Sequence, residues 1–330
     1  MRDYYGVMDL SIVSQKIYAQ INQAQNILLV CHPQPDADAI GSLAAMSAWL
    51  SRLNKKHFKF CRDAVPANLG WLLDFELIGE NIDGFFNQTF DLAIILDSSD
   101  LKYAGLDNIF SKLVKPPFLI NIDHHATNSL FGQINVVMTQ AASTTEIVYY
   151  LFQSSKFNFS PPVANCLLAG LIGDTYNFTN PNTTTESLRM ASGLMANGAS
   201  LTKVVNSVFK NKTVDTIQVW GRALERLYFN QEWQLVTTIV TEADLPLDLP
   251  LAEATEGTAN LLNNLSGVKA VLILQQQPEG IIKGSFRTND NLIDVSKLAK
   301  ILGGGGHRKA AGFKIKGKLV QDKDGGWQIV

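Results

Sequence analysis

Residues 26–38 read NILLVCHPQPDAD, an apolar run that ends at a histidine and is followed by two aspartates. The run 26–31 has the length and composition of a strand buried on both faces, and residues 38–50 behind it predict a helix. The apolar runs 90–96 (FDLAIIL) and 118–122 (FLINI) predict two more strands. Further helices are expected at 143–152 and 162–172. This alternation is typical of an α/β domain, a parallel sheet with helices on both faces.

The second half of the chain predicts a smaller α/β domain behind a helical linker. Helices are expected at 184–196 and 201–229, and the second is long enough to connect two domains. The segments that follow are strands 234–241, 269–276, 281–287 and 313–318 and helices 252–265 and 295–302. We therefore expect an N-terminal domain over residues 1–190, a linker over 191–230 and a second domain over 231–330.

The composition limits the classes of function. Of the 330 residues 46% are hydrophobic, as in an ordinary globular protein with a full core. The formal net charge is −2, so there is no surplus of basic residues. That charge disfavours a protein that coats long nucleic acid, although a few local cations suffice for two or three phosphates. No run of about 18 apolar residues predicts a membrane span, and the first residues do not resemble a signal peptide. The three cysteines form no C-x-x-C pair, which favours buried thiols in a cytoplasmic protein.

Acidic and imidazole side chains follow the apolar segments of the first half at their carboxyl ends. They are His32, Asp36 and Asp38 after 26–31, Asp97 after 90–96, Asp123, His124 and His125 after 118–122, and Asp174 after 167–172. The carboxyl ends of parallel strands meet at one edge, where such folds bind ligands. A single aspartate there is more often a helix cap, but all of these side chains together would repel one another without divalent cations. Oxygen and imidazole ligands without cysteine favour Mn²⁺ over Mg²⁺, Co²⁺ or Fe²⁺.

Taken in order, these motifs are similar to those of the DHH phosphoesterase superfamily. Residues 32–42 (HPQPDADAIGS) resemble its first motif, Asp97 the second, residues 123–125 (DHH) the third and residues 173–175 (GDT) the fourth. Residues 303–312 (GGGGHRKAAG) and 284–288 (GSFRT) resemble the substrate-binding domain called DHHA1. The length and the pairing of domains resemble the NrnA-type branch. Those enzymes degrade very short RNA and remove the 3′-phosphate from adenosine 3′,5′-bisphosphate.

The resemblance implies a function for each candidate residue. One divalent cation would bind His32, Asp36 and Asp97, and a second would bind Asp38, Asp97, His124 and Asp174, so that Asp97 bridges the two. A hydroxide that bridges the cations would attack the phosphate in line. Asp97, Asp123, which orients an imidazole, and His125, which faces the phosphate, are the catalytic candidates. The second domain would bind the nucleotide through Ser285, Arg287, Gly305, Gly306 and His307.

Elementary chemistry agrees with this assignment of the second domain. The planar guanidinium of Arg287 fits a pair of phosphate oxygens, and glycines before His307 expose backbone N–H groups to an anion. A floppy connector is the alternative interpretation of the glycines. Tyr176, close behind Asp174, either narrows the mouth of the site or offers a stacking ring. A cleft between two domains would limit the length of the substrate.

Other functions remain compatible with the same motifs. Related enzymes hydrolyse cyclic dinucleotides such as c-di-AMP or the linear dinucleotide pApA, and exopolyphosphatases and inorganic pyrophosphatases share the metal motifs. The glycine-rich segment argues against a pyrophosphatase, which carries a different C-terminal domain. A catalytically inactive nucleotide-binding sensor is disfavoured because every expected metal ligand is present. The expected partners are short RNA and adenosine bisphosphate, with neither long nucleic acid nor a membrane, and both a monomer and a homodimer remain open.

Overall fold

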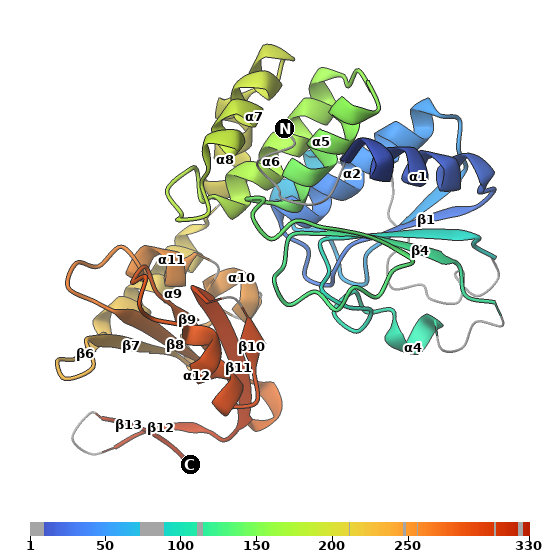
Figure 1. The fold of residues 1–330 in the computed structure, drawn as a ribbon. Coiled ribbons are helices and arrows are strands. Elements are labelled where there is room, and N and C mark those ends of the chain that lie inside the picture. The colour runs from blue at the N-terminus through green and yellow to red at the C-terminus, as the bar shows by residue number, and fades with distance from the viewer. Residues whose placement is uncertain are drawn as a thin grey trace. The chain divides into compact units, whose positions relative to one another are not determined.

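The computed structural model describes residues 10–72, 89–110, 115–210, 212–246, 249–255, 257–306, 308–322 and 326–330. The chain divides into two compact units, Met1–Asn211 and Lys212–Val330. The division falls inside the stretch 191–230 that the sequence predicts as a linker. The first unit holds the first five strands, and the second holds the remaining ones (Figure 1).

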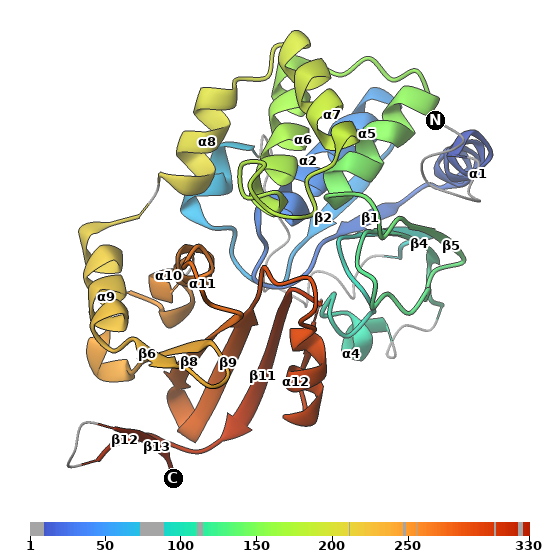
Figure 2. The ribbon, with the colours of Figure 1, turned by 60° about the vertical axis from the view of Figure 1, so that its left-hand side comes forward.

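A five-stranded parallel sheet forms the centre of the first unit, in the order β2–β1–β3–β4–β5 (Figure 2). Its strands are β1 (Ile27–Val30), β2 (His57–Phe60), β3 (Leu92–Leu96), β4 (Phe118–Asp123) and β5 (Ile134–Val137). The three strands predicted from the apolar runs are β1, β3 and β4, the central strands. Both faces of these strands are buried, which explains why their sequences are continuously apolar.

Helices cover both faces of this sheet, as predicted. They are α1 (Leu10–Gln23), α2 (Ala37–Arg52), η1 (Ala67–Leu72), α4 (Asp107–Phe110), α5 (Thr144–Ser154), α6 (Pro161–Asp174), α7 (Thr185–Ala196) and α8 (Leu201–Phe209). Leu29 and Ile94 face the large core shared with α1, α2, α5 and α6. Val30 and Ile95 face a smaller core that includes Ile109 of α4.

The second unit is built on a six-stranded sheet in the order β10–β11–β9–β8–β7–β6, in which only β7 and β8 are parallel. The strands are β6 (Tyr228–Asn230), β7 (Leu235–Val240), β8 (Ala270–Gln277), β9 (Ile281–Arg287), β10 (Gly305–Gly306) and β11 (Ala310–Lys316), followed by the pair β12 (Leu319–Gln321) and β13 (Trp327–Ile329). The helices are α9 (Val214–Glu225), η2 (Glu242–Asp244), α10 (Leu251–Thr255), α11 (Thr258–Leu262), η3 (Pro278–Gly280) and α12 (Val295–Ile301). Phe286 and Phe313 pack beneath α12 on one face, and Leu262 of α11 packs on the other.

Two predicted helices differ in the structure. The single helix 201–229 is wrong, because α8 ends at Phe209 and a new helix begins after Thr213, whose side chain accepts from the N–H of Thr216. The single helix 252–265 is two short helices separated at Gly257, where φ is +87°. The helix predicted at 162–172 is present as α6, which ends at Asp174, so this member of the predicted acidic set lies at the end of a helix and the others at or beyond the ends of strands.

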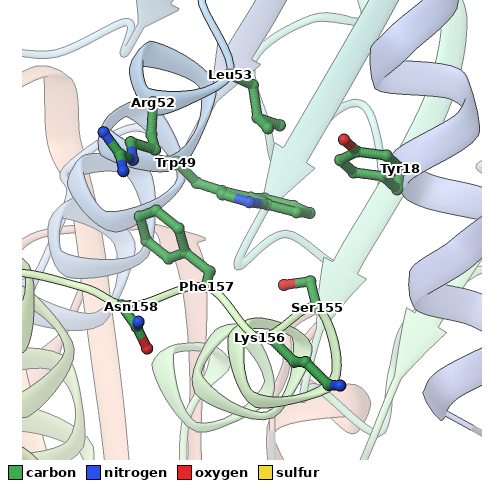
Figure 3. Close-up of a pocket in the computed structure, with 8 residues that line it drawn as sticks. All are labelled: Tyr18, Trp49, Arg52, Leu53, Ser155, Lys156, Phe157 and Asn158. Atoms are coloured by element: carbon green, nitrogen blue, oxygen red, sulfur yellow. The ribbon is translucent and has the colours of Figure 1, made fainter.

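A cavity of about 280 Å³ lies at the carboxyl-terminal end of α2. Figure 3 shows the rings of Tyr18, Trp49 and Phe157 around it. Helix α2 begins just behind the carboxyl end of β1 and runs back toward the start of β2, so this cavity and the predicted acidic set lie at opposite ends of the parallel strands. The cavity is therefore separate from the acidic set.

Candidate metal centre

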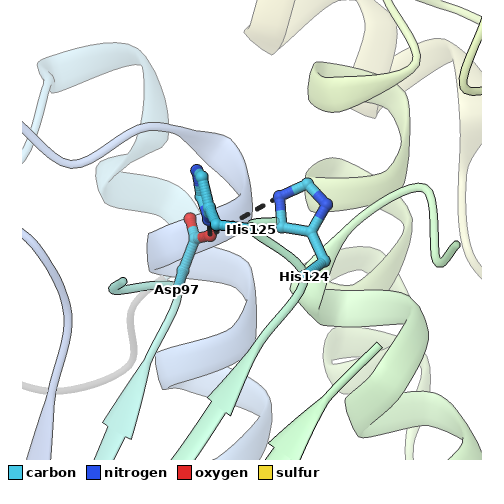
Figure 4. Close-up of side chains that lie close together, drawn as sticks. All are labelled: Asp97, His124 and His125. Carbon is cyan, nitrogen blue, oxygen red and sulfur yellow. Dashed lines mark ion pairs between the residues drawn. The ribbon is translucent and has the colours of Figure 1, made fainter. Parts of the chain in front are cut away.

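The predicted acidic and imidazole side chains lie together at the carboxyl edge of the first sheet. Three groups, each with ligand atoms within 4.8 Å of one another, can hold a metal ion: His32, Asp36 and Asp97; Asp97, His124 and His125; and Asp38, His124 and Asp174. Asp123 joins them through an ion pair with His125. Figure 4 shows Asp97, beyond the end of β3, facing both histidines that follow β4.

Asp97 lies at the middle of this centre. Its carboxylate is buried, with Oδ2 3.4 Å from Nε2 of His32 and Oδ1 3.8 Å from Nε2 of His124. The hydroxyl of Thr144 donates to Oδ1 over 3.1 Å. Its backbone is in the left-handed region, with φ +55°, which costs a non-glycine residue about 1–2 kcal/mol. Such strain is typical of functional positions, and here it directs the carboxylate between two groups of ligands.

The loop after β1 supplies His32 and Asp36. Nδ1 of His32 lies 2.8 Å from the carbonyl oxygen of Pro33, and its Nε2 faces Asp97 and, at 4.0 Å, Asp36. Asp36 is the N-cap of α2 and accepts from the N–H groups of Asp38 and Ala39. The cap function that sequence analysis set against metal binding is therefore present, yet the same carboxylate also faces the centre.

Asp38 is held by the start of α5, a contact that sequence analysis missed. Its buried carboxylate accepts from the N–H of Thr144 over 2.6 Å and from that of Thr145 over 2.8 Å. These N–H groups lie at a helix N-terminus and have no acceptor within the helix, so they favour a negative charge such as that of Asp38. Residues 143–146 (STTE) have the pattern of a capping box, which signals a helix start but not its distant partner.

Replacing Gly170 of α6 by alanine is expected to disturb Asp38. A Cβ at this position would lie 2.6 Å from Oδ1 of Asp38 and 2.4 Å from Cγ2 of Thr145. Relieving these contacts must move the carboxylate or separate the helices, so we expect Gly170→Ala to lose about 1–3 kcal/mol of stability and to weaken Mn²⁺ binding. Thermal unfolding and calorimetric titration measure the two effects. Gly221→Ala is the control, since its Cβ would meet nothing within 4 Å; equal Mn²⁺ affinity in both variants would contradict the prediction.

Asp123 and His125 form a hydrogen-bonded pair beside Asp97, whose Oδ1 lies 3.6 Å from Nδ1 of His125. Oδ1 of Asp123 lies 2.7 Å from Nδ1 of His125, and its Oδ2 accepts from Nδ2 of Asn128 over 2.6 Å. Burial opposes a charged imidazole, but the hydrogen bond and charge of Asp123, with the charge of Asp97, raise the pKa of His125 to about 9. Asn128 was missed by sequence analysis because nothing local in the sequence marks it as a partner of Asp123.

His124 faces Asp174 on the other side of the centre. Its Nε2 lies 3.2 Å from Oδ2 of Asp174, the last residue of α6. Tyr176 packs edge-on against Phe209 of α8, with ring centroids 4.9 Å apart. This contact packs the Tyr176 ring against α8.

The electrostatics of the centre fit divalent cations. Burial and the nearby carboxylates raise the pKa values of Asp38 and Asp174. Burial disfavours the charged form of Asp97 as well, but its hydrogen bond to His32 and the charges of three histidines hold its pKa below the usual range. Burial also opposes charge on His32, while Asp97 and Asp36 raise its pKa to about 10. Buried acids that retain protons for lack of positive charge are a donor set for divalent metal ions.

Mn²⁺ binding is therefore expected to release protons near neutral pH. At about pH 7.5, His32, with a pKa of about 10, is protonated in the metal-free protein and must lose its proton to bind a cation. Because protons compete with the metal, the apparent affinity falls as the pH falls. Calorimetric titrations in buffers of different ionisation enthalpy measure the number released. His57→Gln, which removes an imidazole of β2, should leave that number unchanged, and heats independent of the buffer would contradict the prediction.

The candidate substrate-binding residues lie on the second unit. Arg287 ends β9, with Ser285 on the same face, and Nη1 of Arg287 donates to the carbonyl of Phe286. Among the described residues Arg287 has no acidic partner, and burial lowers its pKa. Gly305 and Gly306 form β10, paired with β11, so they are an edge strand and not a floppy connector. His307 lies outside the described residues.

Comparison with known proteins identifies the family. Residues 26–171 match the DHH family N-terminal domain and residues 252–324 the DHHA1 domain. The chain belongs to the DHH family of phosphoesterases.

Two named enzymes and one solved structure are similar to this chain over most of their length. The bifunctional oligoribonuclease and PAP phosphatase NrnA of Thermus thermophilus is 30% identical over 294 residues, which are 88% of this chain and 84% of the relative. The Bacillus subtilis protein of the same name is 24% identical over 298 residues, with coverages of 89% and 91%. The crystal structure of an exopolyphosphatase-related protein from Bacteroides fragilis has a TM-score of 0.85 at 22% identity and covers 96% of this chain and 94% of its own, which demonstrates the common fold.

Proposed function

We propose that this protein is a metal-dependent phosphoesterase that hydrolyses very short RNA to mononucleotides and adenosine 3′,5′-bisphosphate to AMP. The observation that carries the proposal is the carboxylate of Asp97, which belongs to two of the metal-binding groups at once. A carboxylate shared between two cations is the arrangement used in two-metal phosphoryl chemistry. The names of the Thermus and Bacillus relatives support the choice of substrates.

Two divalent cations would share the centre. We assign His32, Asp36 and Asp97 to one, and the second group consists of Asp38, Asp97, His124 and Asp174. The oxygen and imidazole donors favour Mn²⁺, with Mg²⁺ and Co²⁺ as alternatives. When bound, such cations lower the pKa of water and polarise phosphoryl oxygens.

His125 is proposed to act on the substrate and not as a ligand. Its Nδ1 is occupied by Asp123, which leaves Nε2 as the nitrogen that can donate to a phosphoryl oxygen. In the metal-free protein, against the effect of burial, the pKa of His125 is raised to about 9 by Asp123 and Asp97, and an imidazole N–H held in this orientation suits the stabilisation of negative charge that develops in the transition state. Asn128 holds the other oxygen of Asp123, so the orientation of the imidazole is fixed from behind.

The second unit is proposed to bind the part of the nucleotide that does not react. Arg287, which has no acidic partner among the described residues, would bind a phosphate through its planar fork, with Ser285 beside it. The backbone N–H groups of Gly305 and Gly306 and the side chain of His307 complete the proposed set. We also propose that the protein is cytoplasmic. In the described parts of the chain, no helix has both the length and the hydrophobicity to cross a membrane.

A substrate panel tests the proposal. Purified protein with Mn²⁺ is assayed against adenosine 3′,5′-bisphosphate, RNA dinucleotides, c-di-AMP, pApA and polyphosphate, with a chelator as the metal-free control. We expect AMP from the bisphosphate and mononucleotides from the RNA dinucleotides, both abolished by the chelator. Activity confined to c-di-AMP or pApA, or to polyphosphate, would replace the proposed substrate. Nucleotide binding without turnover of any substrate would indicate a sensor, and light scattering during the same preparation distinguishes monomer from homodimer.

A further inference from the structure

An exposed tyrosine ring lies at the rim of the metal centre. Tyr103, in the turn after β3, is 47% exposed. Its ring centroid is 5.2 Å from that of His32 and 6.3 Å from that of His125. The phenol is therefore beside one candidate metal ligand and beside the imidazole proposed to face the phosphate, while about half of its surface is open to solvent.

The turn holds this ring in place from the backbone. The N–H of Tyr103 donates to Oδ1 of Asp100 over 2.7 Å, and the N–H of Ala104 donates to the carbonyl of Asp100 over 3.0 Å. Ala104 and Leu106 are fully buried in the smaller core and Leu101 packs against it, so the turn is anchored before and after the exposed ring. Core packing thus accounts for Ala104 and Leu106 but not for the exposed half of Tyr103.

The exposed ring of Tyr103, and not its hydroxyl, is the group suited to a ligand. This partly exposed ring contacts His32 and His125 at the metal centre. It is therefore close enough to contact the nucleoside attached to a phosphate that is bound at the centre. Nucleobases stack on such rings, and the stacking tolerates every base because each has a π-face.

We propose that Tyr103 forms a nucleobase-stacking site at the rim of the metal centre and selects substrates with a base next to the scissile phosphate. The proposal rests on the proposed function, because it needs a nucleotide as substrate. It gives the first unit its own contact with the nucleoside, in addition to the phosphate contacts proposed for the second. Substrates without a base, such as polyphosphate, would gain nothing from this ring.

The alternative is that Tyr103 only packs against His32 and His125 and keeps the imidazoles in position. The two functions separate in a cycle that removes the ring and the base independently. Wild type, Tyr103→Ala and Tyr103→Phe are compared on an adenine RNA dinucleotide and on two analogues, each with one adenine replaced by an abasic ribose. Tyr18→Ala, which removes a similarly exposed ring from α1, is the matched control.

We expect Tyr103→Ala to lower kcat/KM for the parent dinucleotide by about 5- to 100-fold, mainly through KM. The loss should shrink to about 2-fold or less for one of the two abasic analogues. Tyr103→Phe and Tyr18→Ala should stay within about 2-fold of wild type on every substrate, and calorimetry should give the same Mn²⁺ affinity for all variants.

Equal losses on all three substrates, or weaker Mn²⁺ binding by Tyr103→Ala, would establish a positioning function and overturn the proposal. No loss on any substrate would overturn it too. If the wild-type protein cleaves none of the dinucleotides, both the proposed function and the proposed stacking site are contradicted. If the wild-type protein cleaves them but the effects of removing the ring and removing the base are independent, only the proposed stacking site is contradicted.

Discussion

Asp97→Asn is expected to abolish the hydrolysis of both proposed substrates, with kcat lower by about 10⁴-fold or more, as for other residues that act within a catalytic unit. The carboxylate of Asp97 faces His32 with one oxygen and His124 with the other. An amide keeps the shape but carries no charge, and its nitrogen cannot bind a cation. We expect the variant to bind less than the full complement of Mn²⁺ and to lack the bridge between the two ion sites.

Asparagine is the sharper substitution because of the backbone at this position. Asp97 has φ +55°, a region that asparagine enters more readily than alanine. A loss of activity in Asp97→Asn therefore reports the missing charge, whereas Asp97→Ala would add strain. The hydroxyl of Thr144 can still donate to the amide oxygen, which preserves the contact with α5.

Asp91→Asn provides the matched control at the other end of the same strand. Asp91 immediately precedes β3 and accepts from the N–H groups of Gln25 and Asn26. Initial rates at saturating substrate, Mn²⁺ stoichiometry by calorimetry and thermal unfolding are measured for both variants. Substantial turnover by a folded Asp97→Asn protein, or equal losses in the two variants, would show that Asp97 does not join the ion sites.

The sequence predicts the central strands and the residues that follow them because both signals are local. A strand buried on both faces must be continuously apolar, and the side chains that leave it are adjacent in the chain. The edge strands β2 and β5 were not predicted, because they lack this continuous apolar pattern. They read HFKF and INVV, and each is only partly buried, so neither has the continuous apolar pattern. The helix at 162–172 was predicted although its sequence is nearly as apolar as that of a strand, and in the structure this helix ends at Asp174.

The supports of the centre could not be predicted, because they join residues that are distant in the chain. Asp38 accepts from Thr144 and Thr145, which lie more than a hundred residues further on. The stacking position of Tyr103 depends on the paths of two separate loops, those after β1 and β3. A single sequence records which side chains are available, whereas their partners are fixed by the packing of α2, α5 and α6. The candidate ligands were therefore accessible from sequence, and the residues that hold them were not.

Arg287→Ala is expected to lower kcat/KM for both proposed substrates by about 10²- to 10³-fold, while Mn²⁺ binding stays unchanged. The guanidinium is part-buried at the end of β9 and has no acidic partner among the described residues, so a substrate phosphate would supply its missing negative charge. Truncation of a buried, charged hydrogen-bond donor costs about 2–5 kcal/mol in binding. Steady-state kinetics and calorimetric Mn²⁺ titration measure the two quantities on the same preparation.

Two further variants separate a planar fork from simple charge. Arg287→Lys keeps the positive charge but loses the paired N–H groups, so we expect it to recover only a small part of the lost kcat/KM. Lys300→Ala removes a positive charge from α12, which packs against the opposite face of the same sheet, and should leave kcat/KM unchanged. If Arg287→Lys has the same kcat/KM as the wild type, Arg287 contributes only its positive charge and not a paired hydrogen bond to phosphate. Loss of Mn²⁺ binding in Arg287→Ala would instead place this arginine among the supports of the metal centre and would contradict the division of function between the two domains.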